Sequence, residues 1–185
     1  MEDAWQRVAA KAAAMFLERG YAATSLRAIA GELGIRAASL YHYCPGGKPE
    51  LYERSLTVLL ERYRDGLEAA RAGAEFPADV EGMVRYVAEH PLVDMQRIFQ
   101  VDLPALGDEV ATGRLLDRVH AAVHAPFAAA FSAAKAAGRV RDDVEPGVAA
   151  AAVVALASGL AALHPGAALP LAGLRLLLDG ARASA

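Results

Sequence analysis

The sequence predicts an all-α protein with a small three-helix module at its N-terminus and a longer helical body behind it. Two observations carry this expectation. Apolar residues recur at i, i+3, i+4 and i+7 through most of the chain, which is the helical period. Strand signals are nearly absent, because no hairpin dipeptide separates alternating segments. We expect about nine helices, and 185 residues that are 55% hydrophobic suffice for their core.

Three short helices are expected first, over residues 4–19, 26–33 and 36–43. Gly20 and Gly34 supply left-handed stops for the first two, and Thr24 or Ser25 caps the second. A turn at residues 45–47 then leads into a long helix over 49–72. Glycines and prolines divide the remainder into helices at about 79–89, 92–101, 108–137, 146–163 and 170–182. The helices lengthen near residue 48, which predicts domains over 1–48 and 49–185.

Composition excludes several classes of protein. Cys44 is the one cysteine, so an internal disulfide and a multi-cysteine zinc cage are both excluded. The acidic start has no apolar run after it, so we expect no signal peptide and a cytoplasmic protein. The net charge of −3 divides into +2 over residues 1–64 and −5 over residues 65–185. A mildly basic head on an acidic body is consistent with a local contact to a polyanion.

One long stretch, residues 146–174, has no Asp, Glu, Lys or Arg. Its longest clean apolar run, residues 148–163 between Gly147 and His164, has 16 residues, and half of them are alanine. A bilayer span needs about 20 residues. We therefore expect a buried or partner-covered helix there rather than a membrane anchor.

Residues 24–43 predict a helix-turn-helix. Two short helices meet at Gly34, where a positive φ favours glycine, and the small Ala30 lets them cross closely. The third helix is then free to present an outer edge, which fits the major groove of DNA. The outward residues expected there are Arg36, Ala37, Ser39, His42 and Tyr43.

Each of these positions has a chemical role in the predicted DNA interface. Arg36 can pair with guanine O6 and N7, the alternatives being a phosphate contact or a solvated charge. His42 can contact a base or the backbone. Of the two tyrosines, helical phase favours Tyr43 over Tyr41 as the phosphate partner, and one of them can instead pack on the first helix.

The flanking helices add candidate phosphate contacts. Ser25 and Arg27 begin the second helix, which should cross the DNA backbone. Lys48 precedes the fourth helix, and its ammonium together with that helix's N-terminal amides makes an anion site.

Residues 9–55 resemble the N-terminal DNA-binding domain of the TetR/AcrR family of transcriptional regulators. The matching elements are Phe16, Glu18-Arg19-Gly20-Tyr21, Thr24-Ser25, Ile29-Ala30, Leu33-Gly34-Ile35, Ser39-Leu40-Tyr41-His42-Tyr43 and Lys48. Cys44 departs from the pattern, since the family usually has phenylalanine there. The resemblance implies an Ω-shaped homodimer whose two N-terminal domains bind a palindromic operator. It also implies that the C-terminal domain binds a small molecule, and that this binding changes the distance between the two N-terminal domains.

The charge-free helices predict where a homodimer would form. One recognition helix buries too little surface for specific binding, and twofold symmetry doubles it. Small residues let the backbones approach closely, so the expected interface residues are Ala152, Ala155, Gly159, Leu174 and Leu178. The alternative is that these residues form intrachain core.

Candidate residues for the small-molecule site combine apolar walls with a few polar groups. They are Tyr86, Met95, Phe99, His120, His124, Phe127 and Phe131, with plain core as the alternative. Asp117, His120 and His124 lie at i, i+3 and i+7, so a metal site is a further reading, against a half-polar helix face. Cys44 is interpreted as a small buried residue, with a redox switch as its alternative.

No glycine-rich phosphate loop, catalytic carboxylate pair or nucleophile elbow is visible, so we expect no enzyme and no cofactor. The expected partners are operator DNA, a small molecule and a second copy of the chain, with no membrane. The competing hypotheses are a helical carrier or enzyme with an incidental helix-turn-helix, and a metal-responsive repressor.

Overall fold

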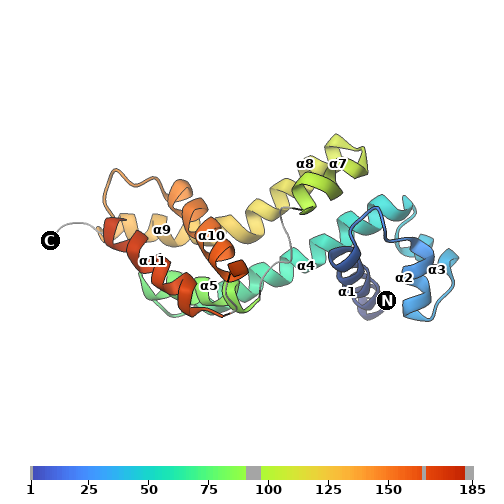
Figure 1. Ribbon diagram of the computed structural model, residues 1–185, viewed down its shortest axis with the longest axis horizontal. Coiled ribbons are helices and arrows are strands. Elements are labelled where there is room, and N and C mark those ends of the chain that lie inside the picture. The colour runs from blue at the N-terminus through green and yellow to red at the C-terminus, as the bar shows by residue number, and fades with distance from the viewer. Residues whose placement is uncertain (1, 91–96, 164–165, 182–185) are drawn as a thin grey trace. The chain divides into compact units, whose positions relative to one another are not determined.

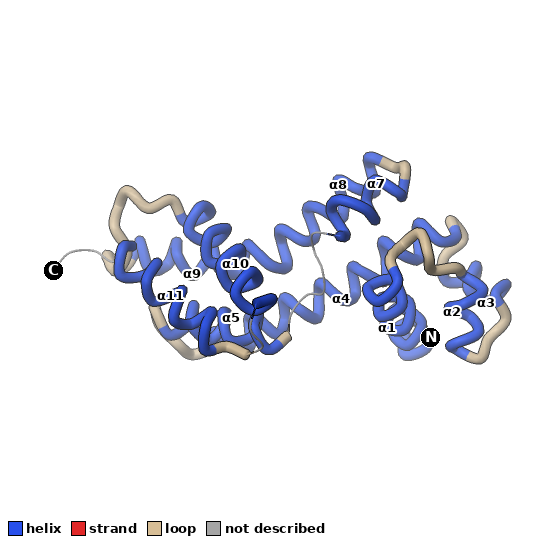
Figure 2. Tube along the Cα trace, in the orientation of Figure 1, coloured by secondary structure: helices blue, strands red, loops and turns tan. Residues whose placement is uncertain are grey.

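The computed structural model describes residues 2–90, 97–163 and 166–181, with the side chains of 2, 3 and 181 left out. All regular elements within these ranges are helices, as Figures 1 and 2 show. The predicted all-α class is therefore confirmed. By packing, the chain divides into two compact units: residues 1–62 with 93–118, and residues 63–92 with 119–185.

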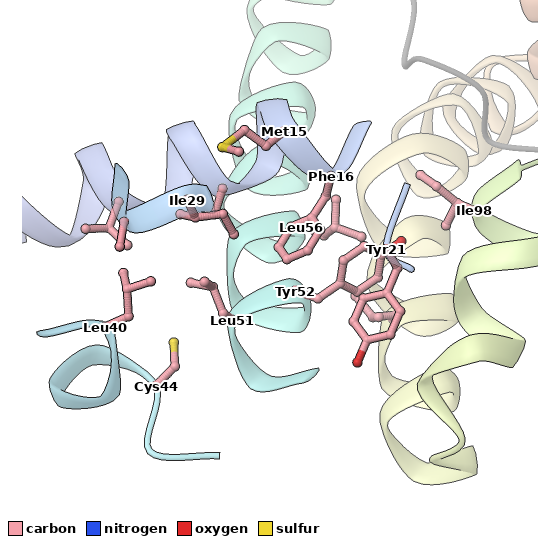
Figure 3. Close-up of a cluster of buried hydrophobic side chains, with 14 of the residues drawn as sticks. Met15, Phe16, Tyr21, Ile29, Leu40, Cys44, Leu51, Tyr52, Leu56 and Ile98 are labelled. Carbon is pink, nitrogen blue, oxygen red and sulfur yellow. The ribbon is translucent and has the colours of Figure 1, made fainter. Parts of the chain in front are cut away.

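The first unit combines the N-terminal helices with a segment from the middle of the chain. It holds α1 (Glu2–Arg19), α2 (Leu26–Leu33), α3 (Ala37–Tyr43), the first part of α4 (Gly47–Arg71), η1 (Ile98–Asp102), α7 (Leu103–Leu106) and α8 (Glu109–Val119). Its core surrounds Phe16 and Tyr52, whose ring centroids lie 4.9 Å apart in an edge-on arrangement (Figure 3). Ile98, Leu103 and Leu115 are buried in the same core. The predicted domain boundary at residue 48 stays a prediction.

The second unit is a helical cluster around α10 (Pro146–Leu163). This helix packs against α9 (Ala125–Ala136), α11 (Ala168–Ala181) and α5 (Ala78–Glu89). Two close approaches join α5 to the second half of α4. A Cβ on Gly66 would meet the ring of Tyr86, and one on Gly82 would meet the carbonyl oxygen of Ala70.

Two π-helical turns interrupt the body helices. One is η1 and the other is η2 (His120–His124), and each ends two residues before a proline, Pro104 and Pro126 respectively. A proline lacks the N–H for a helical bond and its ring crowds the carbonyl four residues earlier. The wider π turn relieves that conflict and lets the helix continue. The expected helix over 108–137 is thus α8, η2 and α9 in succession.

Observed helix limits agree with the expected ones to within two residues at most ends. The exception is the helix expected over 92–101. Residues 91–96 lie outside the described ranges, and residues 98–102 form the π turn. Helix α10 has the predicted bounds and is long and apolar enough to cross a bilayer by length and composition alone, with 22% of it buried. Helices in protein cores share these properties, so this single helix is weak support for a membrane span.

Candidate nucleic-acid interface

Helices α2 and α3 form the predicted helix-turn-helix. Ser25 is the N-cap of α2, and its Oγ accepts a hydrogen bond from the Ala28 amide at 3.1 Å. Gly34 ends the helix at φ 65°, and the following Ile35 amide donates back to the Ala30 carbonyl at 3.0 Å. Asn or glycine tolerates this left-handed turn, and Gly34 does so without steric cost. The capping of α2 by Ser25 and its stop at Gly34 are therefore confirmed.

The inner edge of α3 is closed by apolar packing. Leu40 is buried with Ile29 and Ala30, in the arrangement that Figure 3 shows for Leu40 and Ile29. Arg36 is exposed at the N-cap of α3, and its side chain makes no capping hydrogen bond. His42 is exposed, whereas Ala37 and Ser39 are half-buried. The outer edge of α3, with Arg36 and His42, is thus available to a partner. The inner edge, with Leu40, packs into the core of the first unit.

The two tyrosines of α3 differ in exposure. Tyr41 is 52% exposed. Tyr43 is half-buried, and its ring lies 6.1 Å from that of Trp5 on α1. Tyr43 stands one turn after the buried Leu40 and so shares its inward face, which brings it onto α1. Tyr41 is therefore the more exposed of the two, and the preference for Tyr43 as the phosphate partner stays a prediction.

Lys48 lies at the start of α4 and turns back toward the first helices. Its Nζ lies 4.3 Å from the ring centroid of Tyr21 and donates to the Ala22 carbonyl at 3.3 Å. Burial lowers the pKa of the Lys48 ammonium, while the charge of Asp102 opposes that shift. At the start of α4, the Gly46 amide donates to the Glu50 carboxylate at 2.7 Å, so a carboxylate of the chain itself already occupies this amide. A phosphate contact by Lys48 stays a prediction, as do those of Ser25 and the exposed Arg27.

A group of three side chains, here named the brace, holds the end of α3: Trp5, Glu50 and Arg54. Nη1 of Arg54 donates to the carbonyl oxygen of Tyr43 and lies 3.5 Å from Oε1 of Glu50. The guanidinium carbon sits 4.3 Å from the centroid of the Trp5 ring. Sequence reasoning missed Arg54. The available signal was its position four residues after Glu50 on one helix face.

A second missed residue is Asp102, which is buried at the end of η1. Its Oδ1 accepts a hydrogen bond from the Tyr21 amide at 2.9 Å, and its Oδ2 accepts one from the Tyr52 hydroxyl at 3.3 Å. Nε of Arg97 lies 3.8 Å from the same Oδ2. Burial and the Asp102 carboxylate together raise the pKa of the Tyr52 hydroxyl. Asp102 thus ties η1 to the loop between α1 and α2 and to α4.

Cys44 lies in the core at the end of α3, with 1% of its surface exposed (Figure 3). Burial raises the pKa of its thiol to about 11, against a smaller opposing effect of Arg54. Thiolate is the reactive form of cysteine, so this environment favours a structural role.

We expect the native protein to react slowly with a thiol reagent at pH 8 and much faster near pH 11, where half of the Cys44 thiol would be ionised. Stopped-flow labelling with a disulfide reagent measures this, and the urea-unfolded protein is the control with an accessible thiol. Rapid labelling of the folded protein at pH 8 would contradict a closed site.

The residues predicted to line a small-molecule site are dispersed. Phe127 and Phe131 are buried in the second unit, and the Phe131 ring makes an edge contact with Phe76 at 5.8 Å. Phe99 is 38% exposed on η1 in the first unit, and Met95 lies outside the described residues. Tyr86 is half-buried between Tyr63 and His90, with centroids at 5.2 and 4.3 Å.

His120 and His124 stack on η2 with centroids 5.6 Å apart. Burial lowers the pKa of His124, and the neighbouring His120 lowers it further. In the described part of the chain, no group of three or more His, Cys, Asp or Glu side chains is placed to hold a metal ion. The metal reading of Asp117, His120 and His124 therefore gains no support from the geometry.

One face of α10 is exposed and free of charge. It consists of Val148, Ala151, Ala152, Ala155, Ser158, Gly159, Ala162 and Leu163. The predicted interface residues of α10 are among these, so they remain available to a partner. Leu174 and Leu178 are not available, since both are fully buried within the chain, and their assignment to an interface was wrong. Leu176, which is 79% exposed, lies on the outer face of α11 instead.

Next to this face lies a cavity of about 380 Å³ within the second unit. Its walls are mainly apolar and include Phe131, Val144, Val148, Val153, Leu177 and Leu178. Arg141 and Asp143 pair at its rim. A separate hollow of about 550 Å³ lies in the first unit beside Phe99, Leu103 and Leu116.

Residues 9–54 match the family model described as bacterial regulatory proteins, tetR family. The matched residues run from the middle of α1 to the first turns of α4 and so include the whole helix-turn-helix. No protein of curated function matches the chain in sequence.

Solved structures with this fold cover nearly the whole chain. A TetR-family transcriptional regulator from Thermus thermophilus, PfmR, is 25% identical, with a TM-score of 0.66 over 96% of this chain and 97% of its own. A Saccharomonospora viridis protein solved with choline is 18% identical, with a TM-score of 0.71 over 97% and 95%. The Mycobacterium tuberculosis ketosteroid regulator KstR2 is 21% identical, with a TM-score of 0.60 over 96% and 94%.

Proposed function

Because its helix-turn-helix belongs to the tetR family of bacterial regulatory proteins, we propose that this DNA-binding transcriptional regulator is a ligand-released repressor. It binds a palindromic operator as a homodimer, and a small molecule releases it. Residues 1–48 read the DNA, and residues 49–185 bind the effector and pair the chains. The protein acts in the cytoplasm and needs no cofactor. The observation that carries this proposal is the exposed outer edge of α3 above a sealed inner edge.

The base contact is assigned to Arg36. Its guanidinium is exposed at the amino end of α3, which is the end that reads base edges in this motif. His42 and Tyr41 lie on exposed positions further along and are assigned to base or backbone contacts. Ser25 and Arg27 are assigned to phosphates, because α2 crosses the backbone when α3 enters the groove.

Pairing of two chains is assigned to the uncharged face of α10 and the outer face of α11. Leu163 and Leu176 are 71% and 79% exposed, which is unusual for leucines with several apolar neighbours. Ala152, Ala155 and Gly159 have small side chains that let a second copy approach closely. A dimer would cover this face and give the operator two reading helices.

The effector is assigned to the class of small organic molecules. Two proteins with this fold are named for such compounds, one as a ketosteroid regulator and one in complex with choline. In this chain, Tyr86 and His124 are the half-buried members of the predicted set and can still reach a ligand. The lowered pKa of His124 leaves its imidazole neutral at pH 7, which suits a hydrogen bond to an uncharged group.

Arg36→Ala should lower operator affinity by about 1–3 kcal/mol, or roughly 5- to 150-fold, because a guanine contact would be lost. The operator is first obtained by selecting genomic fragments that bind the wild-type protein, and affinity is measured by fluorescence anisotropy at several salt concentrations. Size-exclusion chromatography of the complex counts the chains on each operator.

Two variants serve as controls for Arg36. Arg27→Ala should weaken binding to all sequences alike and lower the salt slope by about 0.9, as expected for one phosphate contact. Arg139→Ala removes a surface pair with Glu75 in the second unit and should leave DNA affinity unchanged. A wild-type protein that selects no fragment even at low salt would exclude the proposed function and favour a helical carrier.

A further inference from the structure

The recognition helix is short, so its position depends on contacts from outside it. Helix α3 has seven residues, and its last carbonyl groups have no partner within the helix. No side chain caps its amino end. At the other end, Arg54 donates to the Tyr43 carbonyl and lies 3.9 Å from Sγ of Cys44.

The brace joins three helices at this point. Trp5 on α1 packs against the ring of Tyr43 and beneath the guanidinium of Arg54, at 6.1 and 4.3 Å between the respective centres. Glu50 on α4 holds the Arg54 guanidinium at 3.5 Å and accepts the Gly46 amide at 2.7 Å. One arginine therefore has its donors directed at the end of α3 and its flat face on α1.

Resting on the proposed function, we propose that Arg54 is a positioning residue for sequence recognition: it sets the angle at which α3 enters the groove without contacting DNA. A bidentate base contact requires its donors within a few tenths of an ångström, whereas a phosphate contact by a flexible cation does not. Loosening the carboxyl end of α3 should therefore weaken binding to the operator and leave binding to unrelated DNA unchanged.

The test compares operator and unrelated DNA for three variants. Arg54→Met keeps the aliphatic stem and removes the guanidinium, and we expect at least a tenfold loss of operator affinity with less than a twofold change for unrelated DNA. The salt slope should stay that of the wild type. Arg54→Lys keeps a donor but loses the flat face on Trp5, so it should recover part of the loss.

Arg62→Met is the matched control. Arg62 is two turns further along α4, and its guanidinium donates to Oε1 of Gln6 on α1 at 2.9 Å, so its hydrogen bond leads to α1 rather than to α3. It should leave both affinities unchanged. If Arg54→Met fails to fold, Trp5→Leu decides the matter, since it removes the packing of the brace and leaves the Arg54 cation in place.

Three results would overturn the positioning role. Equal loss on operator and unrelated DNA, with a salt slope lowered by about 0.9, would make Arg54 a phosphate contact. Unchanged operator affinity would show that α3 is held without it. A third result would be that the Arg54 and Arg62 variants lose operator affinity in the same proportion to their drop in unfolding temperature. Arg54 would then act only through the stability of the fold. If the wild-type protein selects no DNA, the proposed function itself is wrong. That outcome differs from the three above, so the failure of the proposed function can be told apart from the failure of the positioning role of Arg54.

Discussion

Asp102→Ala should destabilise the first unit by about 3 kcal/mol, because it removes the acceptor of several buried donors at once. The Tyr21 amide at 2.9 Å would lose its partner inside the core, and the Tyr52 hydroxyl and the Arg97 guanidinium would lose theirs on the same carboxylate. An amide left buried without an acceptor costs about 1–3 kcal/mol alone. Urea unfolding followed by circular dichroism measures the change.

Asp102→Asn is the control for shape. The side-chain amide keeps an oxygen for the Tyr21 amide, but its NH2 group replaces the oxygen that accepts from Tyr52 and pairs with Arg97. Only part of the network is lost, so the expected loss is about 1 kcal/mol. Stability of the alanine variant within 0.5 kcal/mol of the wild type would mean that the hydrogen bonds of Asp102 do not hold the unit together.

Gly82→Ala should destabilise the second unit by about 2 kcal/mol, although alanine is the better helix former. The added methyl group would meet the Ala70 carbonyl oxygen of α4, and a backbone atom can yield only if the whole helix α5 moves away. Overpacking of this kind costs up to about 3 kcal/mol, and the gain in helix propensity returns about 1 kcal/mol. Thermal unfolding measures the balance.

The same substitution elsewhere in the chain supplies its control. A Cβ on Gly113, inside α8, would have no atom within 4 Å, so Gly113→Ala should raise stability by about 0.5–1 kcal/mol. Equal effects at Gly82 and Gly113 would mean that propensity, rather than the approach of α4 to α5, governs both positions.

Local patterns predicted most of the fold. The stops at Gly20 and Gly34, with φ of 84° and 65°, depend on a few neighbouring residues and could be read directly from the chain. The same holds for the limits of α10, which follow from Pro146 and from the charge-free run behind it. The resemblance over residues 9–55 supplied the rest of the helix-turn-helix, and the family match over 9–54 confirms it.

Contacts between distant residues were beyond such patterns. Asp102 bonds to an amide 81 residues earlier in the chain, and no helical period links the two. The contact of Tyr43 with Trp5 likewise joins two helices that are far apart in the sequence, α3 and α1. Pro104 suggested a break, but the π turn before it lets the helix continue. A second π turn precedes Pro126, inside the helix that was expected to run unbroken over 108–137.

The interleaved make-up of the first unit also governs when it can be completed during synthesis. A ribosome releases the helix-turn-helix long before residues 98–115, which contribute Ile98, Leu103 and Leu115 to the same apolar cluster. Until that later stretch emerges, the nascent chain must carry the Tyr21 and Tyr52 face uncovered. The first unit therefore cannot finish folding until residues 98–115 have been synthesised. A chain truncated before residue 97 would leave that face exposed to chaperones and proteases.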